Sequence, residues 1–308
     1  MHKTRLFGLM LLVFLWVLWT SISYGGSVAV TTIDCPGASM TQLTGINNSG
    51  QIAGYCDQAV GVLYSGGVFT PIIDPASPGY TRPMAIDDNG QIVGTANSGD
   101  SGFLYSGGIF SQLAYPGATD TEANGINDSG EIVGLYIVLP NEHGFLYSGG
   151  IFTTIDYPGA IWTQLWGVNN VGEVVGTYWS NGQHGFLYTG GTFTSIDYPG
   201  DSSIQPTGIN DSGEIVGTYT LINGGGTTYS FSLSGGVYTT IDEPAGAVAN
   251  GVNDSGDIVG YYSDQSSCCR GFLDTSTIPE PRPAFLMASG LVVLGVVRRG
   301  ILRPARKV

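Results

Sequence analysis

The 308-residue sequence predicts an all-β fold: a six-bladed β-propeller of four-stranded antiparallel blades, closed by pairing of its N- and C-terminal strands. Three observations predict it: a composition rich in glycine and poor in charge, a unit that recurs six times, and array ends that complete one another. Glycine supplies 49 of 308 residues and charged residues only 11 %. Such a chain is too weakly charged to be intrinsically disordered, and its glycines favour strands joined by tight turns.

The first half of the unit reads, in its fullest copy, Gly-Ile-Asn-Asp-Ser-Gly-Glu-Ile-Val-Gly. Its copies start at Gly45, Ala85, Gly125, Gly167, Gly208 and Gly251. Asn and Asp bond to nearby backbone and glycine accepts positive φ, so the Asn-Asp-Ser-Gly segment predicts a short hairpin loop. The unit therefore begins with two antiparallel strands.

The second half reads Gly-Phe-Leu-Tyr-Ser-Gly-Gly-Ile-Phe. Copies begin at Gly61, Gly102, Gly144 and Gly185, with a degenerate copy around Ser230. A Gly-Gly pair suits a two-residue hairpin turn. The strands are apolar on both faces, with Phe145 and Tyr147 on one side and Leu146 on the other. Such a sheet must be covered on both sides by neighbours, which favours radial blades over the alternative of a β-solenoid.

The two ends of the array are halves of one hairpin. The last unit stops at residues 271–273, the first strand of a second-half hairpin, and the first unit starts at residues 30–34, its second strand. An open array would expose two sheet edges, which proteins avoid. Pairing the ends completes a sixth hairpin and closes the ring.

The cysteines test this closure. The register of the Gly-Gly hairpin places Arg270 opposite Asp34 and Cys269 opposite Cys35. Opposed residues lie close enough for a disulfide, so we expect a Cys35–Cys269 bridge, with Cys56–Cys268 as the remaining pair. Free buried thiols are the alternative, and no histidine near these residues in sequence supports a metal site.

Residues 1–25 are predicted to be a signal peptide. Lys3 and Arg5 precede an apolar run over residues 6–19, and small residues follow, with cleavage expected after Gly25. A retained membrane anchor is the alternative, but the run is short for a span. The propeller is then expected over residues 26–276.

Residues 277–308 form a second targeting segment. It combines Pro279-Glu280-Pro281, an apolar run over residues 284–297, and then Arg298 and Arg299. This order resembles the PEP-CTERM sorting signal of Gram-negative bacteria. The resemblance implies an exosortase as a transient partner, membrane contact through the apolar run, and export to the cell surface or extracellular matrix. Arg282-Pro283 and the nine residues after Arg299 depart from the pattern. A single-pass tail anchor is the alternative.

The repeat resembles the HAF-type extracellular repeat over about residues 28–274. The His-Ala-Phe element is present only loosely, as His143-Gly144-Phe145 and His184-Gly185-Phe186. That family is defined by its repeat rather than by a chemistry. The resemblance therefore implies an extracellular location but no reaction.

Charge narrows the choice of partner. Residues 34–274 hold 23 acidic and two basic residues, a formal charge of −21. Nucleic acid is excluded as a partner, because its binding requires Lys and Arg at the phosphates. An anionic membrane surface is unfavourable for the same reason.

Residues that could carry chemistry are few. His143 and His184 are each expected to face an aspartate, Asp156 and Asp197, but Arg270 with Asp34 fills the same position, so we interpret these pairs as structural and expect no catalytic residue. Oxygen-rich turns give weak calcium candidates, which are Asp128, Glu131, Asp211, Glu214, Asp254 and Asp257. Turn chemistry is the simpler interpretation because other copies carry Asn48 with Gln51 and Asn170 with Glu173. No other cofactor is expected.

Three tryptophans, Trp162, Trp166 and Trp179, crowd one unit. Exposed aromatic rings stack on sugar rings, and a neutral glycan tolerates an acidic surface; filling of the core is the alternative. We therefore expect a non-enzymatic exported protein that binds exopolysaccharide or another envelope component. The alternative is a secreted glycoside hydrolase or lyase, which would need a carboxylate pair or a base in a central pocket.

Overall fold

A computed structural model describes residues 30–275, apart from residues 58, 98–100, 199–201, 222–225, 242–243 and 264–268. The expected signal peptide and sorting tail, including Pro279, Glu280, Pro281, Arg298 and Arg299, lie outside these residues. Within the described ranges no helix is long and apolar enough to cross a membrane.

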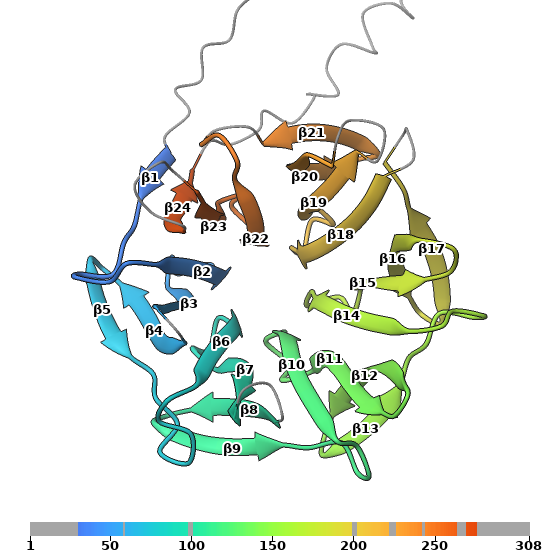
Figure 1. Cartoon of the computed structure of the whole chain (residues 1–308), viewed down its shortest axis with the longest axis horizontal. Coiled ribbons are helices and arrows are strands. Elements are labelled where there is room, and N and C mark those ends of the chain that lie inside the picture. The colour runs from blue at the N-terminus through green and yellow to red at the C-terminus, as the bar shows by residue number, and fades with distance from the viewer. Residues whose placement is uncertain are drawn as a thin grey trace, which may run out of the picture.

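The chain forms a six-bladed β-propeller of four-stranded antiparallel blades, arranged radially in Figure 1. Residues from all six blades line a central channel. The innermost strands are β2 (Thr41–Ile46), β6 (Thr81–Ile86), β10 (Asp120–Ile126), β14 (Thr163–Val168), β18 (Ser202–Ile209) and β22 (Val248–Val252). The second strands are β3 (Ile52–Cys56), β7 (Ile92–Ala96), β11 (Ile132–Val138), β15 (Val174–Trp179), β19 (Ile215–Leu221) and β23 (Ile258–Tyr262). The third strands are β4 (Val60–Ser65), β8 (Ser101–Ser106), β12 (Asn141–Ser148), β16 (Gln183–Thr189), β20 (Thr228–Ser234) and β24 (Arg270–Asp274). The outermost are β5 (Val68–Pro71), β9 (Ile109–Leu113), β13 (Ile151–Thr154), β17 (Thr192–Ile196), β21 (Val237–Ile241) and β1 (Val30–Thr32).

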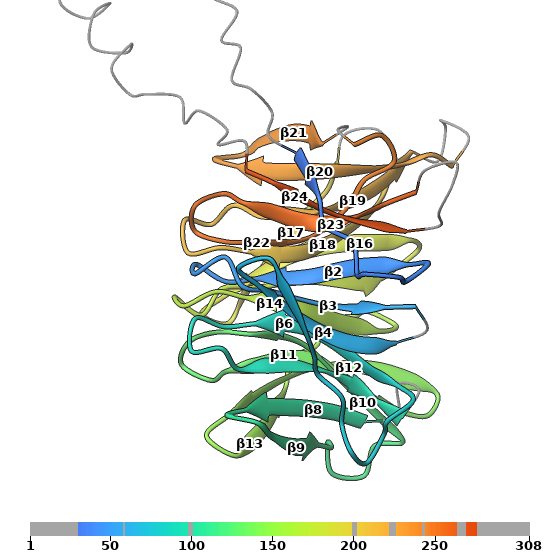
Figure 2. The same ribbon diagram turned by 90° about the vertical axis from the view of Figure 1, so that its left-hand side faces the viewer.

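The ring is closed as the sequence predicts. β1 pairs antiparallel with β24, Val30 opposite Asp274 and Thr32 opposite Phe272, so one blade takes its outer strand from the N-terminal end of the array. The two strands lie side by side in the face view and in the edge view (Figures 1 and 2).

The core lies between the blades. The third strands bury a phenylalanine in five of the six blades, each at most 1 % exposed: Phe103, Phe145, Phe186, Phe231 and Phe272. Clusters cross from blade to blade, as where Val133 of β11 packs with Leu165 and Phe186 of the next blade. Full burial of such a side chain contributes about 1.5–3 kcal/mol.

Two positions in the repeat show why glycine recurs there from copy to copy. A Cβ on Gly45 would lie 2.9 Å from the Cα of Ala85 on the neighbouring inner strand, because the six inner strands converge at the channel. In the Gly-Gly turn, Gly149 and Gly150 have φ values of 59° and 88°, the left-handed pair that a type I′ hairpin requires.

The predicted Cys35–Cys269 bridge is wrong: Cys35 is bonded to Cys56. The register holds as far as Asp34, which forms an ion pair with Arg270 at 2.6 Å. The chain then leaves the ladder, since the Cys35 N–H donates to Thr41 Oγ1 and the side chain turns toward Cys56. The expected Cys56–Cys268 pair is excluded with it, and Cys268 lies outside the described residues.

The disulfide occupies the place of an aromatic stack. In three other copies of the repeat, the residues at the Cys35 and Cys56 positions are tyrosines whose rings stack with centroids 3.6–3.8 Å apart: Tyr115 with Tyr136, Tyr157 with Tyr178, and Tyr198 with Tyr219. The bridge therefore fastens the connection from β1 to β2, beside the closing blade.

We expect the double change Cys35→Ser, Cys56→Ser to lower the free energy of unfolding by about 3 kcal/mol, since the bond closes a loop of about 20 residues. Urea unfolding measures the loss, and mapping of peptic peptides from the unreduced chain identifies the bridge. Cys269→Ser is the control and should leave the unfolding midpoint unchanged. A Cys35–Cys269 peptide would contradict the assignment.

Candidate functional site

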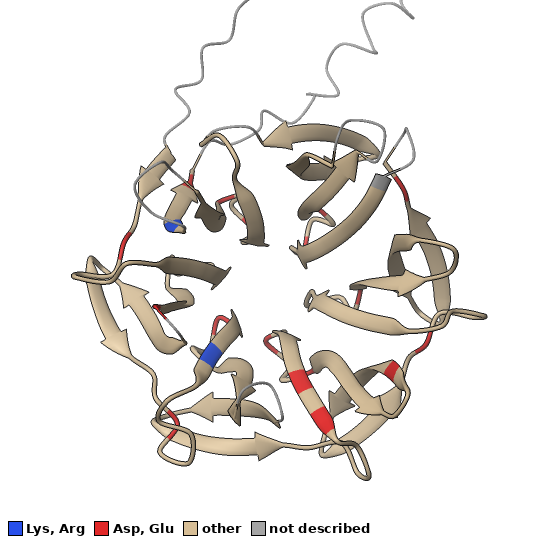
Figure 3. Cartoon of the chain, viewed as in Figure 1, with Lys and Arg blue, Asp and Glu red and all other residues tan. Residues whose placement is uncertain are grey.

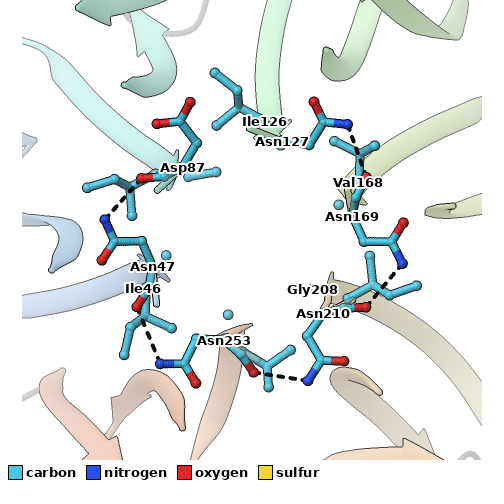
Figure 4. A pocket seen from close by; sticks show the side chains of 18 of the residues that line it. Ile46, Asn47, Asp87, Ile126, Asn127, Val168, Asn169, Gly208, Asn210 and Asn253 are labelled. Atoms are coloured by element: carbon cyan, nitrogen blue, oxygen red, sulfur yellow. Dashed lines mark hydrogen bonds between the residues drawn. The ribbon is translucent and has the colours of Figure 1, made fainter. Parts of the chain in front are cut away.

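The channel has two mouths of different character. At one, which we call the uniform mouth, each inner strand is followed by two residues that are Asn or Asp in every blade. The first ring is Asn47, Asp87, Asn127, Asn169, Asn210 and Asn253, and the second is Asn48, Asp88, Asp128, Asn170, Asp211 and Asp254. Figure 4 shows the first ring around the axis.

Five asparagines of the first ring tie each blade to the next. The Asn127 Nδ2 donates to the Asn169 carbonyl oxygen at 3.0 Å, and the pattern continues around the ring to the Asn47 carbonyl oxygen. Asp87 receives such a bond from Asn47 but has no amide hydrogen to donate onward. The ring is thus interrupted at one of its six joints (Figure 4).

The second ring is complete. The backbone N–H of each member donates to a side-chain oxygen of the next, as from Asp128 to Asn170 at 2.8 Å, and the last bond returns from Asp254 to Asn48. The Nδ2 groups of Asn48 and Asn170 each donate to both flanking carboxylates. These aspartates are therefore held by hydrogen bonds between blades.

The calcium candidates belong to this mouth. Asp128, Asp211 and Asp254 are in the second ring, while Glu131, Glu214 and Asp257 accept hydrogen bonds from the Asn side chain four residues earlier. No group of three or more His, Cys, Asp or Glu residues in the described ranges is arranged to hold a metal. Calcium binding stays a prediction.

The opposite end, which we call the variable mouth, breaks the repeat. Its outer layer is Gln42, Arg82, Glu122, Gln164, Gln205 and Val248, and its inner layer is Thr44, Met84, Asn124, Trp166, Thr207 and Asn250. A cavity of about 180 Å³ is lined by the whole inner layer, by Gln42 and Gln205 of the outer layer, and by Tyr55 and Tyr261. The inner layer also lines the cavity of the uniform mouth, so it separates the two.

A β-bulge explains the inner layer. In all six inner strands the pairing register shifts by one residue, and the residue skipped is the inner-layer one, such as Trp166 between Leu165 and Gly167. Bulges re-aim a side chain and are common beside functional sites. Here they direct six different side chains toward the axis.

The variable mouth holds polar groups whose hydrogen bonding is incomplete. Asn124 is 5 % exposed; its Nδ2 donates to the Leu165 carbonyl oxygen, but its Oδ1 is buried with no partner among the described residues. Leaving a buried acceptor unsatisfied costs about 1–3 kcal/mol, and such groups often mark a site for a ligand or water.

Glu122 is the acid of this mouth. Burial is the main cause that raises its pKa, and the charges of Glu142 and Asp120 raise the pKa further, while Arg82 lowers it. Glu142 accepts a hydrogen bond from the Gln164 Nε2 at 2.5 Å, whereas Glu122 has no hydrogen-bond partner among the described residues. Sequence reasoning missed Glu122; the available signal was a carboxylate at a position filled by glutamine in three other copies.

The structure divides the three tryptophans. Trp166 lies in the variable mouth, its Nε1 donating to Thr177 Oγ1 at 2.9 Å. Trp162 and Trp179 form a separate pair at the start of β14 and the end of β15, with ring centroids 6.0 Å apart. Trp179 is 39 % exposed.

The histidines lie outside the channel, on third strands. His143 Nδ1 is 2.7 Å from Asp156 and His184 Nδ1 is 3.2 Å from Asp197, and Arg270 with Asp34 fills the same position. The predicted cross-strand pairs are confirmed.

Comparison with known proteins gives distant structural similarities only. No family model matches the chain, and no curated protein does either. Among solved structures, the chain is similar to virginiamycin B lyase from Staphylococcus aureus, at 12 % identity over 80 % of this chain and 98 % of that chain, TM-score 0.47. It is also similar to TolB from Acinetobacter baumannii, at 11 % identity over 76 % and 63 %, TM-score 0.47. A third similar structure is the β-propeller domain of the Trilobed protease from Pyrococcus furiosus, at 11 % identity over 78 % and 95 %, TM-score 0.47.

We expect Asp87→Asn to stabilise the protein at pH 7 by about 1 kcal/mol, because the new amide can donate to the Asn127 carbonyl oxygen. Burial raises the pKa of Asp87 from its ordinary 3.8. The folded state then binds the proton more tightly than the unfolded state, so wild-type stability falls as the pH rises through this raised pKa. The gain should therefore be larger at pH 7 than near pH 4.

Thermal unfolding at the two pH values measures this gain. Asp88→Asn is the charge-matched control and should give no gain, because the Asp88 carboxylate already accepts bonds from Asn48. A gain for Asp87→Asn that does not depend on pH would contradict the account.

Proposed function

We propose that the protein is an exported, non-enzymatic propeller of the Gram-negative cell surface or extracellular matrix, and that it binds glycan at the variable mouth. The N-terminal apolar run, the Pro-Glu-Pro tail and the resemblance to HAF-type repeats support this location, with an exosortase as the partner during sorting. The Cys35–Cys56 disulfide supports it too, because disulfides persist mainly in exported proteins.

The observation that carries glycan binding is the lining of the variable mouth. Three aromatic residues, Trp166, Tyr55 and Tyr261, line its cavity together with the amide side chains of Gln42 and Gln205. A sugar ring has an apolar face and a rim of hydroxyls, so it requires this combination of aromatic surface and groups that both donate and accept. Ligand sites are typically concave and carry a few placed polar groups.

The positions at which the six repeats differ in sequence also support a ligand site at the variable mouth. At the uniform mouth, bonds between blades complete the second ring and form five of the six joints of the first, so these residues are fixed by the ring. The variable mouth places twelve positions of mixed chemistry around the axis, and Asn124 keeps an acceptor without a partner among the described residues. We infer that this is where the ring is adapted to a ligand. The acidic body favours a glycan of low charge density.

We expect the oxidised chain to bind exopolysaccharide fragments saturably in titration calorimetry, and Trp166→Phe to weaken that binding at least tenfold. The smaller ring removes stacking area and the hydrogen bond to Thr177. Trp179→Ala is the matched control and should bind normally.

Loss of binding in Trp179→Ala alone would move the site to the pair of Trp162 and Trp179. No heat with any glycan tested would reject glycan binding. Binding that requires added calcium would indicate that the acidic turns of the uniform mouth hold a calcium ion.

A second candidate function, a glycoside hydrolase or lyase, is favoured by one observation. Glu122, with its raised pKa, lies on β10 beside Glu142, and hydrolases of this kind need two carboxyl groups of which one holds its proton.

Our proposal predicts that the wild-type chain releases no new reducing ends from a bound glycan, and that Glu122→Gln leaves binding within about threefold. A reducing-end assay and calorimetry on the same samples measure both. Turnover by the wild type that Glu122→Gln abolishes, while Asp156→Asn does not, would establish the enzyme instead.

A further inference from the structure

Arg82 is the cation that the described part of the chain leaves without an acidic partner. The described residues contain two Lys or Arg side chains, Arg82 and Arg270 (Figure 3). Arg270 is paired with Asp34 at 2.6 Å, whereas no ion pair or hydrogen bond of Arg82 is formed within those residues. In a body with 23 acidic residues between positions 34 and 274, an unpaired arginine is unexpected.

The guanidinium is nevertheless held in place. Its central carbon lies 4.8 Å from the ring centroid of Tyr55 and 4.7 Å from that of Tyr80. Each such contact contributes about 0.5–2 kcal/mol. Tyr55 is itself fixed, since it is buried and its hydroxyl donates to Gln42. The contacts with the two rings hold the guanidinium without using its N–H donors.

A hollow borders this group. It is an open depression of about 860 Å³ between the first two blades, and it is lined by Met40, Asp57, Asn97, Arg82 and the segment 76–80. Among the residues of the variable mouth, Arg82 alone lines it. The segment is one residue longer than its counterparts before β2, β10 and β14. Ser77 shapes it, donating to the Tyr80 carbonyl oxygen and accepting from the Asn97 N–H.

The chemistry of the hollow selects its ligand. A planar guanidinium matches a carboxylate, with two parallel N–H···O bonds. Asp57 also lines the hollow and is ionised, because its Oδ1 accepts hydrogen bonds from the Ser39 N–H and hydroxyl, which lower its pKa. Its negative charge disfavours a ligand that carries many anionic groups. Glu122, on the next inner strand, adds a further acid near Arg82. A dense polyanion would be repelled, whereas a single carboxylate at the guanidinium edge would not.

We propose that this hollow binds the carboxylate of an acidic sugar, so that the glycan recognised by the protein carries isolated uronate residues. The inference rests on the proposed glycan-binding function and adds its specificity. Arg82 pairs with the uronate carboxylate in the hollow, while the neighbouring sugars extend toward the variable mouth. The two are adjacent, because Tyr55 contacts Arg82 and also lines the mouth cavity.

The test uses a matched pair of ligands: an oligosaccharide with one glucuronate residue, and its carboxyl-reduced form, in which glucose replaces glucuronate. Titration calorimetry on the oxidised chain should show at least tenfold tighter binding of the acid. Arg82→Gln should abolish that preference, so that the acid and its reduced form bind with equal affinity. Arg82→Lys should retain only part of the preference, because a point charge lacks the planar pair of donors.

Arg270→Gln is the control, since it removes the same charge elsewhere on the ring, and it should keep the full preference. Tyr80→Leu gives a second variant should Arg82→Gln unfold in a thermal melt; loss of one covering ring should reduce the preference severalfold. Equal binding of both ligands by the wild type, or equal effects of the two arginine changes, would overturn the inference. Binding of neither ligand would instead count against glycan binding as a whole.

Discussion

Burial of both faces of every blade is the constraint on which the rest of this structure depends. The third strands carry buried phenylalanines, and the clusters around them draw residues from two blades at once. No blade can therefore be stable at an open end, because one apolar face would meet water. Closure by β1 and β24 follows from this requirement. Close to the closing blade, a disulfide joins Cys35 and Cys56 at positions that hold stacked tyrosines in three other copies.

The same closure divides the channel into two chemistries. Six inner strands converge so tightly that a Cβ at Gly45 would meet Ala85, and the residues that follow complete side-chain-to-backbone belts between blades. A belt that links every blade to the next leaves its members little freedom to change. The bulge residues lie earlier in each strand and are less uniform. Four of the six also donate to a carbonyl oxygen of the next blade, yet residues as different as Met84, Asn124 and Trp166 occupy these positions. Variation is therefore concentrated at the mouth where a ligand can use it.

Much of this could be predicted from the sequence. The Gly-Gly turn and strand alternation set the hairpin register, which is correct as far as the pairs of Arg270 with Asp34 and His143 with Asp156. The disulfide could not be predicted from register, because the chain leaves the ladder after Asp34; the informative signal was that Cys35 and Cys56 occupy paired tyrosine positions. The sequence also could not show which tryptophan faces the channel. Strand alternation predicts the face on which a side chain lies, but the bulge at Trp166 breaks that period of two.

The charges at the variable mouth show how an acidic protein can still recognise a polar ligand. Arg82 and Glu122 occupy equivalent positions on the neighbouring strands β6 and β10, yet no ion pair joins them in the described part of the chain. An ion pair between them would neutralise both charges and leave neither group free to bind a ligand. Contacts with the rings of Tyr55 and Tyr80 stabilise the cation by other means and use none of its N–H donors. At physiological salt the surrounding negative field decays within about 8 Å, so attraction and selection are both local. In the proposed site, the acidic surface then disfavours polyanions, while the Arg82 guanidinium admits a ligand with a single well-placed carboxylate.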